Sequence, residues 1–352
     1  FYDQVPDIIS RYIKPGLLFG CSGGGIIGNG EEAEQQAAIS ITCAELPNVK
    51  IQPLQFETNN LPDQDTAPSV WRDWFKVDVA DNPHFVFLAD PFSFQGEEFL
   101  AGVDFAYPNS KKVGGLASGA QGPGGNSMYL GDKIYNSGLV GIALTGEIEV
   151  DTIVAQGCRP IGEPMQITKC EETLLQELEG KPPLEVLQEL HETLSDSDKQ
   201  LLQTSLFLGI EMDPMKDNPK QGDFLIRNLM GIDRESGGLA IGTLLRNGQL
   251  VQFHLRDKKM SAEDLDVMLT RYLNLGNAEN AKGALLFSCL GRGQYLYGEA
   301  NHDTDMFQNK LGKIPLGGFF CNGEIGPVGN TTFLHGYTSS FGIFRSPESG
   351  AS

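Results

Sequence analysis

The chain has 352 residues, enough for two domains of ordinary size, and 40% of them are hydrophobic, as in proteins with a sizeable core. Its formal net charge of −20 disfavours general binding to nucleic-acid phosphates and to anionic membrane surfaces. No apolar run approaches the ~20 residues that cross a bilayer, and no signal-peptide pattern opens the chain. Six widely spaced cysteines without a CxxC pair favour free thiols in a reducing compartment, so we expect a cytoplasmic protein.

Short strand-like runs, separated by Gly, Pro, Asn and Asp, dominate the first half of the chain. The glycine-rich segment Gly114–Gly125 predicts a loop or tight turns. Two segments, 69–76 and 95–104, have helical character. The predicted strands are 17–20, 39–45, 49–56, 84–90, 139–145 and 150–156.

The composition changes near residues 157–165, where we place a domain boundary. In the acidic segment that follows, leucines from Leu184 to Leu194 recur on one helical face. We interpret this segment as a helix that covers a sheet, and a docking helix for a partner is the alternative.

In the second half, Asn247-Gly248 indicates a hairpin between strands 238–245 and 249–256. Ser261 is a plausible N-cap for a helix that continues to about Leu275. Further strands are predicted at 283–290, 316–321 and 332–344.

These elements predict an α/β protein of two domains, with mixed β-sheets flanked by helices. The expected domains are 1–157 and 158–346, followed by a tail at 347–352. An internal echo raises the possibility of a duplication, because Leu17–Gly25 and Leu285–Gly293 agree at six of nine positions. A strand followed by glycine is a common pattern, so duplication and chance both stay open.

The most informative stretch is residues 317–344, where two hydrophobic strands flank a polar turn. The turn carries Cys321, Asn322 and Glu324, and buried polar groups are costly unless they are paired. We therefore interpret this stretch as part of a site or of a domain junction.

Residues 317–344 resemble the C-terminal signature of the FIST family, which is named jointly from F-box proteins and signal-transduction proteins. Gly20-Cys21-Ser22, with Gly25 and Ile27, resembles the first family motif. Gly114–Gly119 resembles the second motif, and Leu286–Cys289 with Gly291–Gly293 resembles the third. The motifs occur in the expected order, and the chain begins in what resembles the middle of the first strand–helix unit, so we expect N-terminal residues to be missing.

The resemblance implies a FIST N-like domain at 1–157 and a FIST C-like domain at 158–346. It also implies a non-enzymatic intracellular sensory protein without a cofactor, which binds a small, amino-acid-like ligand and passes a signal to a partner protein. The F-box relatives suggest the alternative of a protein-interaction scaffold without a small ligand. The expected ligand-binding residues lie in the motifs: Cys21, Ser22, Gly114, Gly115, Ser118, Cys289, Arg292, Cys321, Asn322 and Glu324.

Arg292 and Glu324 are the charged members of this set, and each follows an apolar strand among glycines. Arginine binds carboxylates through its planar fork, and a glutamate could receive an ammonium, so together they would suit a zwitterion. The alternative is an internal Arg–Glu pair that joins two loops.

Two glycine patterns suggest other functions. Gly23, Gly25 and Gly28 satisfy the dinucleotide motif GxGxxG, and Glu45 lies where a ribose-binding acid would belong, but Asn29–Ala38 is too short for a crossover helix. Gly20–Gly24 also satisfies the nucleophile-elbow pattern GxSxG, yet no helix-forming segment follows Ser22.

Cysteine catalysis is a third possibility, with Cys21, Cys289 or Cys321 as the nucleophile and an activating neighbour such as Arg292 or His335. A small buried hydrophobic residue is the commoner role of cysteine. We expect His335 to be a core histidine that activates none of these thiols.

The five histidines show no metal-binding spacing, and His302–Asp305 could hold a cation only weakly. We therefore predict no metal site.

Overall fold

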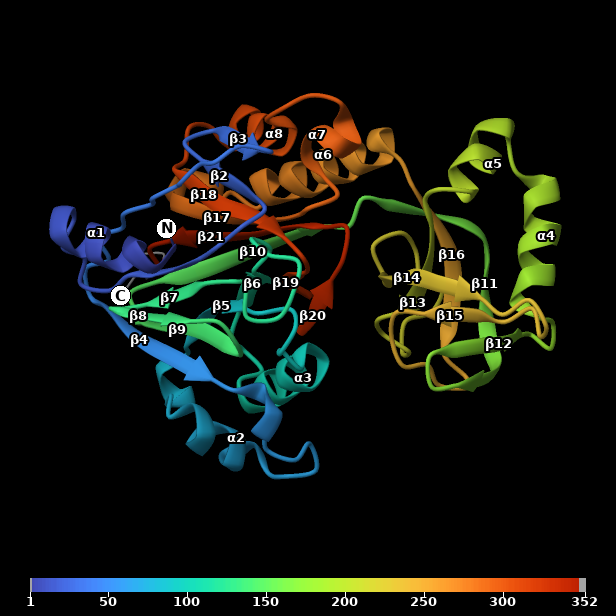
Figure 1. Cartoon of the computed structure of the whole chain (residues 1–352), viewed down its shortest axis with the longest axis horizontal. Coiled ribbons are helices and arrows are strands. Elements are labelled where there is room, and N and C mark those ends of the chain that lie inside the picture. The colour runs from blue at the N-terminus through green and yellow to red at the C-terminus, as the bar shows by residue number, and fades with distance from the viewer. Residues whose placement is uncertain (1, 348–352) are drawn as a thin grey trace. The chain divides into compact units, whose positions relative to one another are not determined.

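The computed structural model describes residues 2–347 and divides the chain into two compact units (Figure 1). The first unit comprises Phe1–Val154 and Asp266–Ser352, and the second unit, Ala155–Leu265, is inserted between these two parts of the sequence. The chain enters the second unit close to the boundary expected near 157, but its return at Asp266 has no counterpart in the sequence prediction. Positions 348–352 of the predicted tail lie outside the described residues.

Two six-stranded sheets form the first unit, and they confirm the predicted α/β class with mixed sheets. One sheet has the order β10 (Glu149–Ala155), β21 (Ser339–Arg345), β17 (Ala281–Cys289), β18 (Leu316–Cys321), β2 (Gly25–Gly28), β3 (Glu31–Glu34). The other has the order β20 (Thr331–His335), β19 (Glu324–Val328), β6 (Lys112–Leu116), β5 (His84–Ala89), β9 (Leu139–Gly146), β4 (Val49–Phe56). A small third sheet joins β1 (Phe19–Cys21), β7 (Met128–Leu130) and β8 (Lys133–Tyr135).

The two large sheets repeat one topology. Strands β5 and β6 are parallel and joined through α3 (Gly96–Ala106), and β17 and β18 are parallel and joined through α7 (Gly293–Tyr297) and α8 (His302–Leu311). The strands on either side of each parallel pair run antiparallel to it. This repeated topology supports a duplication. It places β17 in correspondence with β5, however, and not with Leu17–Gly25, the N-terminal half of the sequence echo.

Glycines lie at the tightest points of the two parallel pairs. A Cβ atom on Gly114 would lie 1.9 Å from the carbonyl oxygen of Phe87, and one on Gly318 would lie 1.9 Å from that of Leu286. Because no side chain fits at this distance, both positions require glycine for strand pairing.

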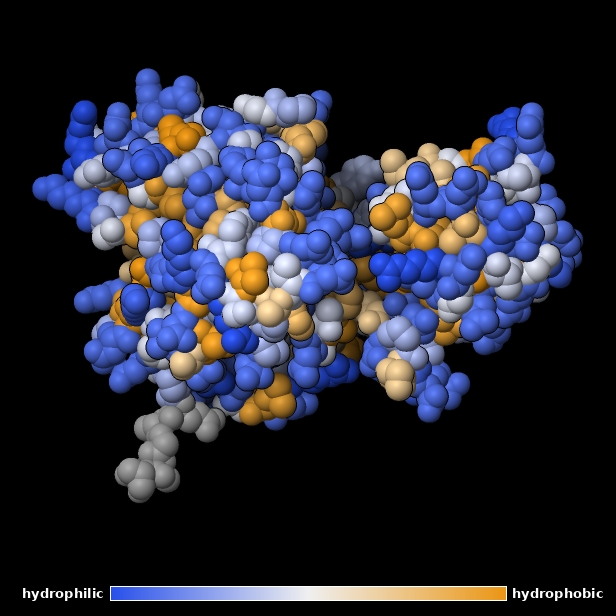
Figure 2. Space-filling view, turned by 90° about the horizontal axis from the view of Figure 1, so that it is seen from below, coloured by the Kyte–Doolittle hydropathy of each residue, from blue (hydrophilic) through white to orange (hydrophobic). Residues whose placement is uncertain are grey.

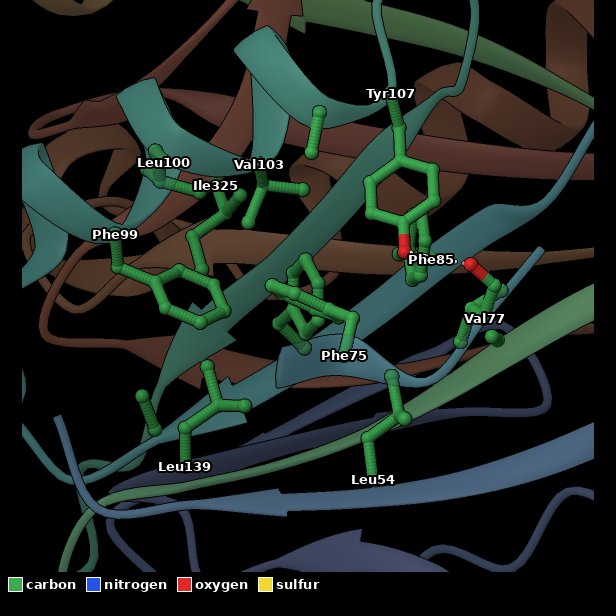
Figure 3. Packing of buried hydrophobic residues seen from close by; sticks show 14 of the residues in the cluster. Leu54, Phe75, Val77, Phe85, Phe99, Leu100, Val103, Tyr107, Leu139 and Ile325 are labelled. Carbon is green, nitrogen blue, oxygen red and sulfur yellow. Dashed lines mark hydrogen bonds between the residues drawn. The ribbon is translucent and has the colours of Figure 1, made fainter. Parts of the chain in front are cut away.

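The first unit has four layers, because helices cover the outer face of each sheet. Figure 3 shows the hydrophobic cluster in which α3 and Phe75, from α2 (Pro68–Phe75), pack against β5 and its neighbours. On the other sheet, Phe307 of α8 stacks on Phe341 of β21 with ring centroids 5.3 Å apart. A second cluster, which includes Val113 and Phe287, fills the space between the two sheets.

The second unit is a closed barrel filled by aliphatic side chains and Phe253. The strand order is β11 (Cys158–Glu171), β12 (Leu174–Leu178), β15 (Leu239–Ile241), β14 (Phe224–Ile232), β13 (Leu206–Glu211), β16 (Leu250–Arg256). Helix α4 (Pro183–Thr193) packs Val186, Leu187 and Leu190 against the barrel interior, as the interpretation of a covering helix predicts. Helix α5 (Asp196–Leu202) follows it.

Five local predictions are wrong. The predicted loop 114–125 begins inside a strand, because residues 114–116 pair with β5 as part of β6. The predicted strand 332–344 is two strands, β20 and β21, which belong to different sheets.

Segment 39–45 is not a strand. Its side chains instead occupy the space beside glycines of two strands, with Ser40 against Gly28 of β2 and Thr42 against Gly317 of β18. Strands β15 and β16 form no hairpin, since β16 pairs with β11 and β13 to close the barrel.

The predicted N-cap is also displaced. Helix α6 (Lys258–Asn274) begins before Ser261, whose hydroxyl donates to the carbonyl of Gly157. Asp257 accepts instead from the N–H of Met260.

Among the described residues, the remaining α-helix is α1 (Val5–Tyr12). Within residues 2–347, no helix is long and apolar enough to span a membrane. Hydrophilic side chains dominate the face shown in Figure 2, and the hydrophobic ones form small separate patches on it.

Candidate functional site

The four motif loops meet at the carboxyl ends of the two parallel strand pairs. Ser118, after β6, donates its N–H to the carbonyl of Ser22 at 3.2 Å, and its hydroxyl accepts from the N–H of Gly24 at 2.9 Å. The Ser118 hydroxyl also donates to the carbonyl of Phe320. Asn322, after β18, donates its N–H to the carbonyl of Leu116 at 3.1 Å. The segments therefore form one junction, which we call the loop junction.

The third motif reaches the same place. Leu290, after β17, donates its N–H to the carbonyl of Cys321 at 3.0 Å, and a Cβ atom on Gly24 would lie 2.9 Å from its side chain. In open α/β sheets, ligands bind outside the carboxyl ends of the strands. The loop junction thus has the position in the fold that binding sites commonly take.

A buried polar network that the sequence prediction missed supports the loop junction. The amide of Asn126 donates to Asp90 at 3.0 Å, and the Ser22 hydroxyl accepts from the N–H of Ser127 at 3.0 Å. Ser22 also donates to Asn126, at 3.4 Å. Asp90 directly follows the apolar run of β5, and this position after a buried strand is the signal that could have identified it.

The serine at the loop junction is not placed as a hydrolase nucleophile. Ser22 is 3% exposed, and the strand β2 follows it where a nucleophile elbow has a helix. Dinucleotide binding needs a crossover helix after Gly23 and Gly25, and β2 occupies that position in the chain as well. The structure therefore argues against both a serine hydrolase and a dinucleotide-binding site.

Two thiols at the loop junction, those of Cys21 and Cys321, are poor nucleophiles. Burial raises the pKa of Cys21 and of Cys321 well above the usual value, and the charge of Glu324 adds to this effect on Cys321. Only the thiolate is reactive, so these two cysteines stay protonated and inert at neutral pH. Cys289 is half-buried and lies opposite Cys321 in the register of β17 and β18. None of the six cysteines forms a disulfide, as the sequence predicts.

Arg292 is buried beneath the loop junction and is bound within the protein. Its Nε and Nη2 donate to Asp303 at 2.7 and 3.1 Å, and Nη2 also donates to the hydroxyl of Tyr297 at 2.5 Å. Among the described residues, its buried Nη1 has no hydrogen-bond partner. The ion-pair partner of Arg292 within the protein is therefore Asp303, from α8, and not Glu324.

Burial alone would raise the pKa of Asp303, but the charge of Arg292 and the hydrogen bonds from His302, Arg292 and Ser339 outweigh it and hold this pKa below its usual range. Asp303 is therefore an anion that is fixed in the fold. Residues 2–347 contain no group of His, Cys, Asp and Glu side chains that could hold a metal ion, His302 and Asp303 included.

Glu32 is a second buried acid that the sequence prediction missed, and no local pattern marks it. One of its carboxylate oxygens accepts from the N–H of Thr304 at 2.8 Å, at the start of α8. Its other oxygen, Oε2, is buried without a hydrogen-bond partner among the described residues. Burial, followed by the charge of Asp303, raises the pKa of Glu32 to about 7.

Glu324 is fully buried and contributes to the framework of the loop junction. Its Oε2 accepts from the N–H and the hydroxyl of Thr338 at 3.1 and 2.9 Å. It lies opposite Gly115 on β6 and opposite His335 on β20. His335 is buried as well, and its Nε2 lies 2.9 Å from the carbonyl oxygen of Gly326.

Gly114 and Gly115 have packing roles, since a Cβ atom on Gly115 would lie 2.4 Å from the sulfur of Cys321. The solvent-facing part of the loop junction consists of Asn322 and Gly24, which are exposed, and Leu290, which is 38% exposed. The amide of Asn322 donates to the carbonyl of Ala117 at 3.2 Å. Of the predicted site residues, Asn322 thus presents the most accessible polar side chain.

Comparison with known proteins gives a consistent result. The FIST N domain matches residues 2–181, and the FIST C domain matches residues 183–327. An uncharacterized protein of Mycobacterium tuberculosis is 34% identical over 348 residues, which cover 97% of this chain and 88% of that protein. An uncharacterized protein of Mycobacterium bovis is 34% identical over 345 residues, covering 97% of this chain and 87% of that protein.

A more distant relative is an F-box/LRR-repeat protein of Arabidopsis thaliana, 26% identical over 142 residues that cover 36% of this chain and 27% of that protein. Together, the matched domains cover nearly the whole chain, and the order of the motifs agrees with them. The chain therefore belongs to the FIST family of signal-transduction domains.

Proposed function

We propose that this protein is a non-enzymatic, cytoplasmic sensory domain that binds a small, amino-acid-like ligand at the loop junction. The observation that carries the proposal is the meeting of four loops at the carboxyl ends of two parallel strand pairs, each from a different sheet. A ligand held there would touch both sheets at once, so that its binding would couple them. The signal would then pass to a partner protein.

In this proposal, Asn322 and the exposed backbone of Gly24 contact the ligand. The buried members of the predicted set, which include Ser22, Ser118 and Arg292, hold the loops in place. The fixed internal partners of Arg292 and the raised thiol pKa values favour binding over catalysis.

A thermal-shift screen over the amino acids tests the proposal. A ligand present at 100 times its dissociation constant stabilises the native state by about 2.7 kcal/mol, which raises the melting temperature by several degrees. Asn322→Ala should abolish that shift. Asn330→Ala, at another exposed asparagine in the turn between β19 and β20, should leave it unchanged. A ligand whose shift survives Asn322→Ala binds elsewhere and contradicts the assignment of the site.

A protein-interaction scaffold is the second candidate. Tyr295 is 84% exposed, and it lies in α7, close in sequence to the exposed Leu290 of the loop junction. The similarity to an F-box/LRR-repeat protein also favours this function. If no amino acid shifts the melting temperature but Tyr295→Ala prevents the co-purification of a cellular protein, the scaffold function is the better account.

A further inference from the structure

Strand β3 is bound to two helices through the side chains of Glu32 and Glu34. It is the edge strand of its sheet, next to β2, and it lies beside the N-terminal ends of α7 and α8 (Figure 1). Glu32 Oε1 accepts from the N–H of Thr304 at 2.8 Å. Glu34 Oε1 accepts from the N–H of Gln294 at 2.9 Å. The N–H of Glu32 itself donates to Asn301 Oδ1 at 2.7 Å. We call these three hydrogen bonds the clasp contacts.

The charges around Glu32 disfavour its ionised form. Its Oε2 is buried and has no hydrogen-bond partner among the described residues. The negative charge of Asp303, on α8, acts on Glu32, and Glu34 adds a second negative charge from the same strand. The buried cation of this region, Arg292, donates to Asp303, and so does Nδ1 of His302. Strand β2 has no titratable side chain. Glu32 therefore faces negative charge while the neighbouring positive charge is bound to Asp303.

These surroundings make the attachment of β3 depend on protons. Burial, followed by the charge of Asp303, outweighs the hydrogen bonds from Thr304 and raises the pKa of Glu32 from 4.5 to about 7. When β3 leaves α8, Glu32 enters water and its pKa returns to the ordinary value. The attached state thus binds a proton more tightly than the open state, so protonation favours attachment. This stabilisation is complete below about pH 4.5 and is lost as the pH rises to about 7.

Strand β3 also covers part of the third motif. A Cβ atom on Gly293 would collide with the carboxylate of Glu34, so this glycine lies directly beneath that side chain. Gly293 begins α7, which carries the exposed Tyr295. Opening of β3 would therefore uncover the start of α7, while β2 stays paired with β18.

We propose that β3 is a proton-operated clasp, which closes on α7 and α8 when the surroundings become acidic and loosens as the pH rises to neutral. Its closed form is the one in which the clasp contacts are made and the third motif is covered. This regulation belongs to the strand and its two helices, and it does not depend on a ligand at the loop junction.

Hydrogen exchange measured by NMR tests the clasp, because the amides of Glu32, Thr304 and Gln294 are the donors of the clasp contacts. Protection factors, which are corrected for the base catalysis of exchange, report the fraction of open molecules. A pKa of about 7 in the closed state and 4.5 in the open state predicts that the open fraction rises about ten-fold from pH 6 to pH 8. The three protection factors should fall by the same factor.

The amide of Val86, in the core of the first unit, distinguishes local opening from unfolding. It should be more strongly protected than the amides of the clasp contacts at both pH values. If all these amides share one protection factor, β3 opens only when the whole unit unfolds, and the proposal is overturned.

Variants identify the group that binds the proton. Glu32→Gln keeps an acceptor for Thr304 but cannot ionise, so its protection factors should be equal at pH 6 and pH 8. Glu31→Gln, at an exposed position of the same strand, should keep the ten-fold fall. A ten-fold fall that persists in Glu32→Gln would assign the pH dependence to another group and would also overturn the proposal.

Discussion

Replacing Asp303 with asparagine tests the buried ion pair beneath the loop junction. Arg292 is completely buried, and Asp303 accepts two of its N–H groups. Asparagine keeps the shape of the side chain but leaves the guanidinium without a counter-ion. Removing one partner of a buried pair costs about 3–5 kcal/mol, because the other charge stays buried and uncompensated. We expect a loss of this size in the stability of the first unit.

The position of the tryptophans allows that unit to be followed by itself. The chain has two, Trp71 and Trp74, and both belong to the first unit. Their fluorescence during thermal unfolding therefore reports on the first unit without a tryptophan signal from the barrel. At about 2–4 °C for each kcal/mol, the melting temperature seen by this fluorescence should fall by about 6–20 °C.

A matched control uses another ion pair of α8. Lys310 lies 2.8 Å from Asp266, whose side chain is 47% exposed, and such surface pairs contribute about 0–1 kcal/mol. Asp266→Asn should therefore have little effect. If Asp303→Asn lowers the free energy of unfolding no more than Asp266→Asn does, then burial does not strengthen the contribution of the Arg292–Asp303 pair to stability, and the reasoning is wrong.

Two further predictions concern stability. Because the folded state raises the pKa of Glu32 to about 7, its carboxylate destabilises the fold increasingly as the pH rises from about 4.5 to 7. Glu32→Gln should therefore be about 1–3 kcal/mol more stable than the original protein at pH 8, and no more stable at pH 4.5. Urea titrations at the two pH values measure this difference. Glu31→Gln, at an exposed site, is the control and should show no such dependence on pH. Gly318→Ala should prevent soluble expression, because its Cβ atom would collide with the carbonyl of Leu286, whereas Gly283→Ala on the neighbouring strand meets only an ordinary contact at 3.7 Å; a soluble Gly318→Ala protein with unchanged circular dichroism would contradict the packing argument.

The sequence identified the motif segments of the site but not the way in which they work. Glycines and polar residues at strand ends mark the loops at Ser22, Ser118 and Asn322, and the structure brings these loops together. The roles of individual residues differ from those expected. Arg292 and Glu324, interpreted as the two halves of a zwitterion site, are both buried and bound to internal partners.

Local patterns located about half of the described strands and helices, because hydrophobic periodicity and turn residues act within a few positions of the chain. They failed where pairing depends on distant segments. The expected hairpin at Asn247-Gly248 does not form because β16 completes a barrel with β11 and β13. Segment 39–45 has the composition of a strand, yet it forms no strand and packs instead against glycines of β2 and β18.

The sequence by itself determined the α/β class, the family and the segments that form the loop junction. Only the tertiary structure decided that one unit is inserted into the other, that Asp303 is the partner of Arg292, and that Glu32 binds Thr304 across 272 positions of the chain. It also decided that His84 and Glu149, at the ends of strands in different sheets, lie 4.0 Å apart. The physical reason is that the packing of the whole core fixes such pairings. The free energy of that packing is a sum over contacts between residues that are distant in sequence, and the conformational preference of a short segment does not contain this information.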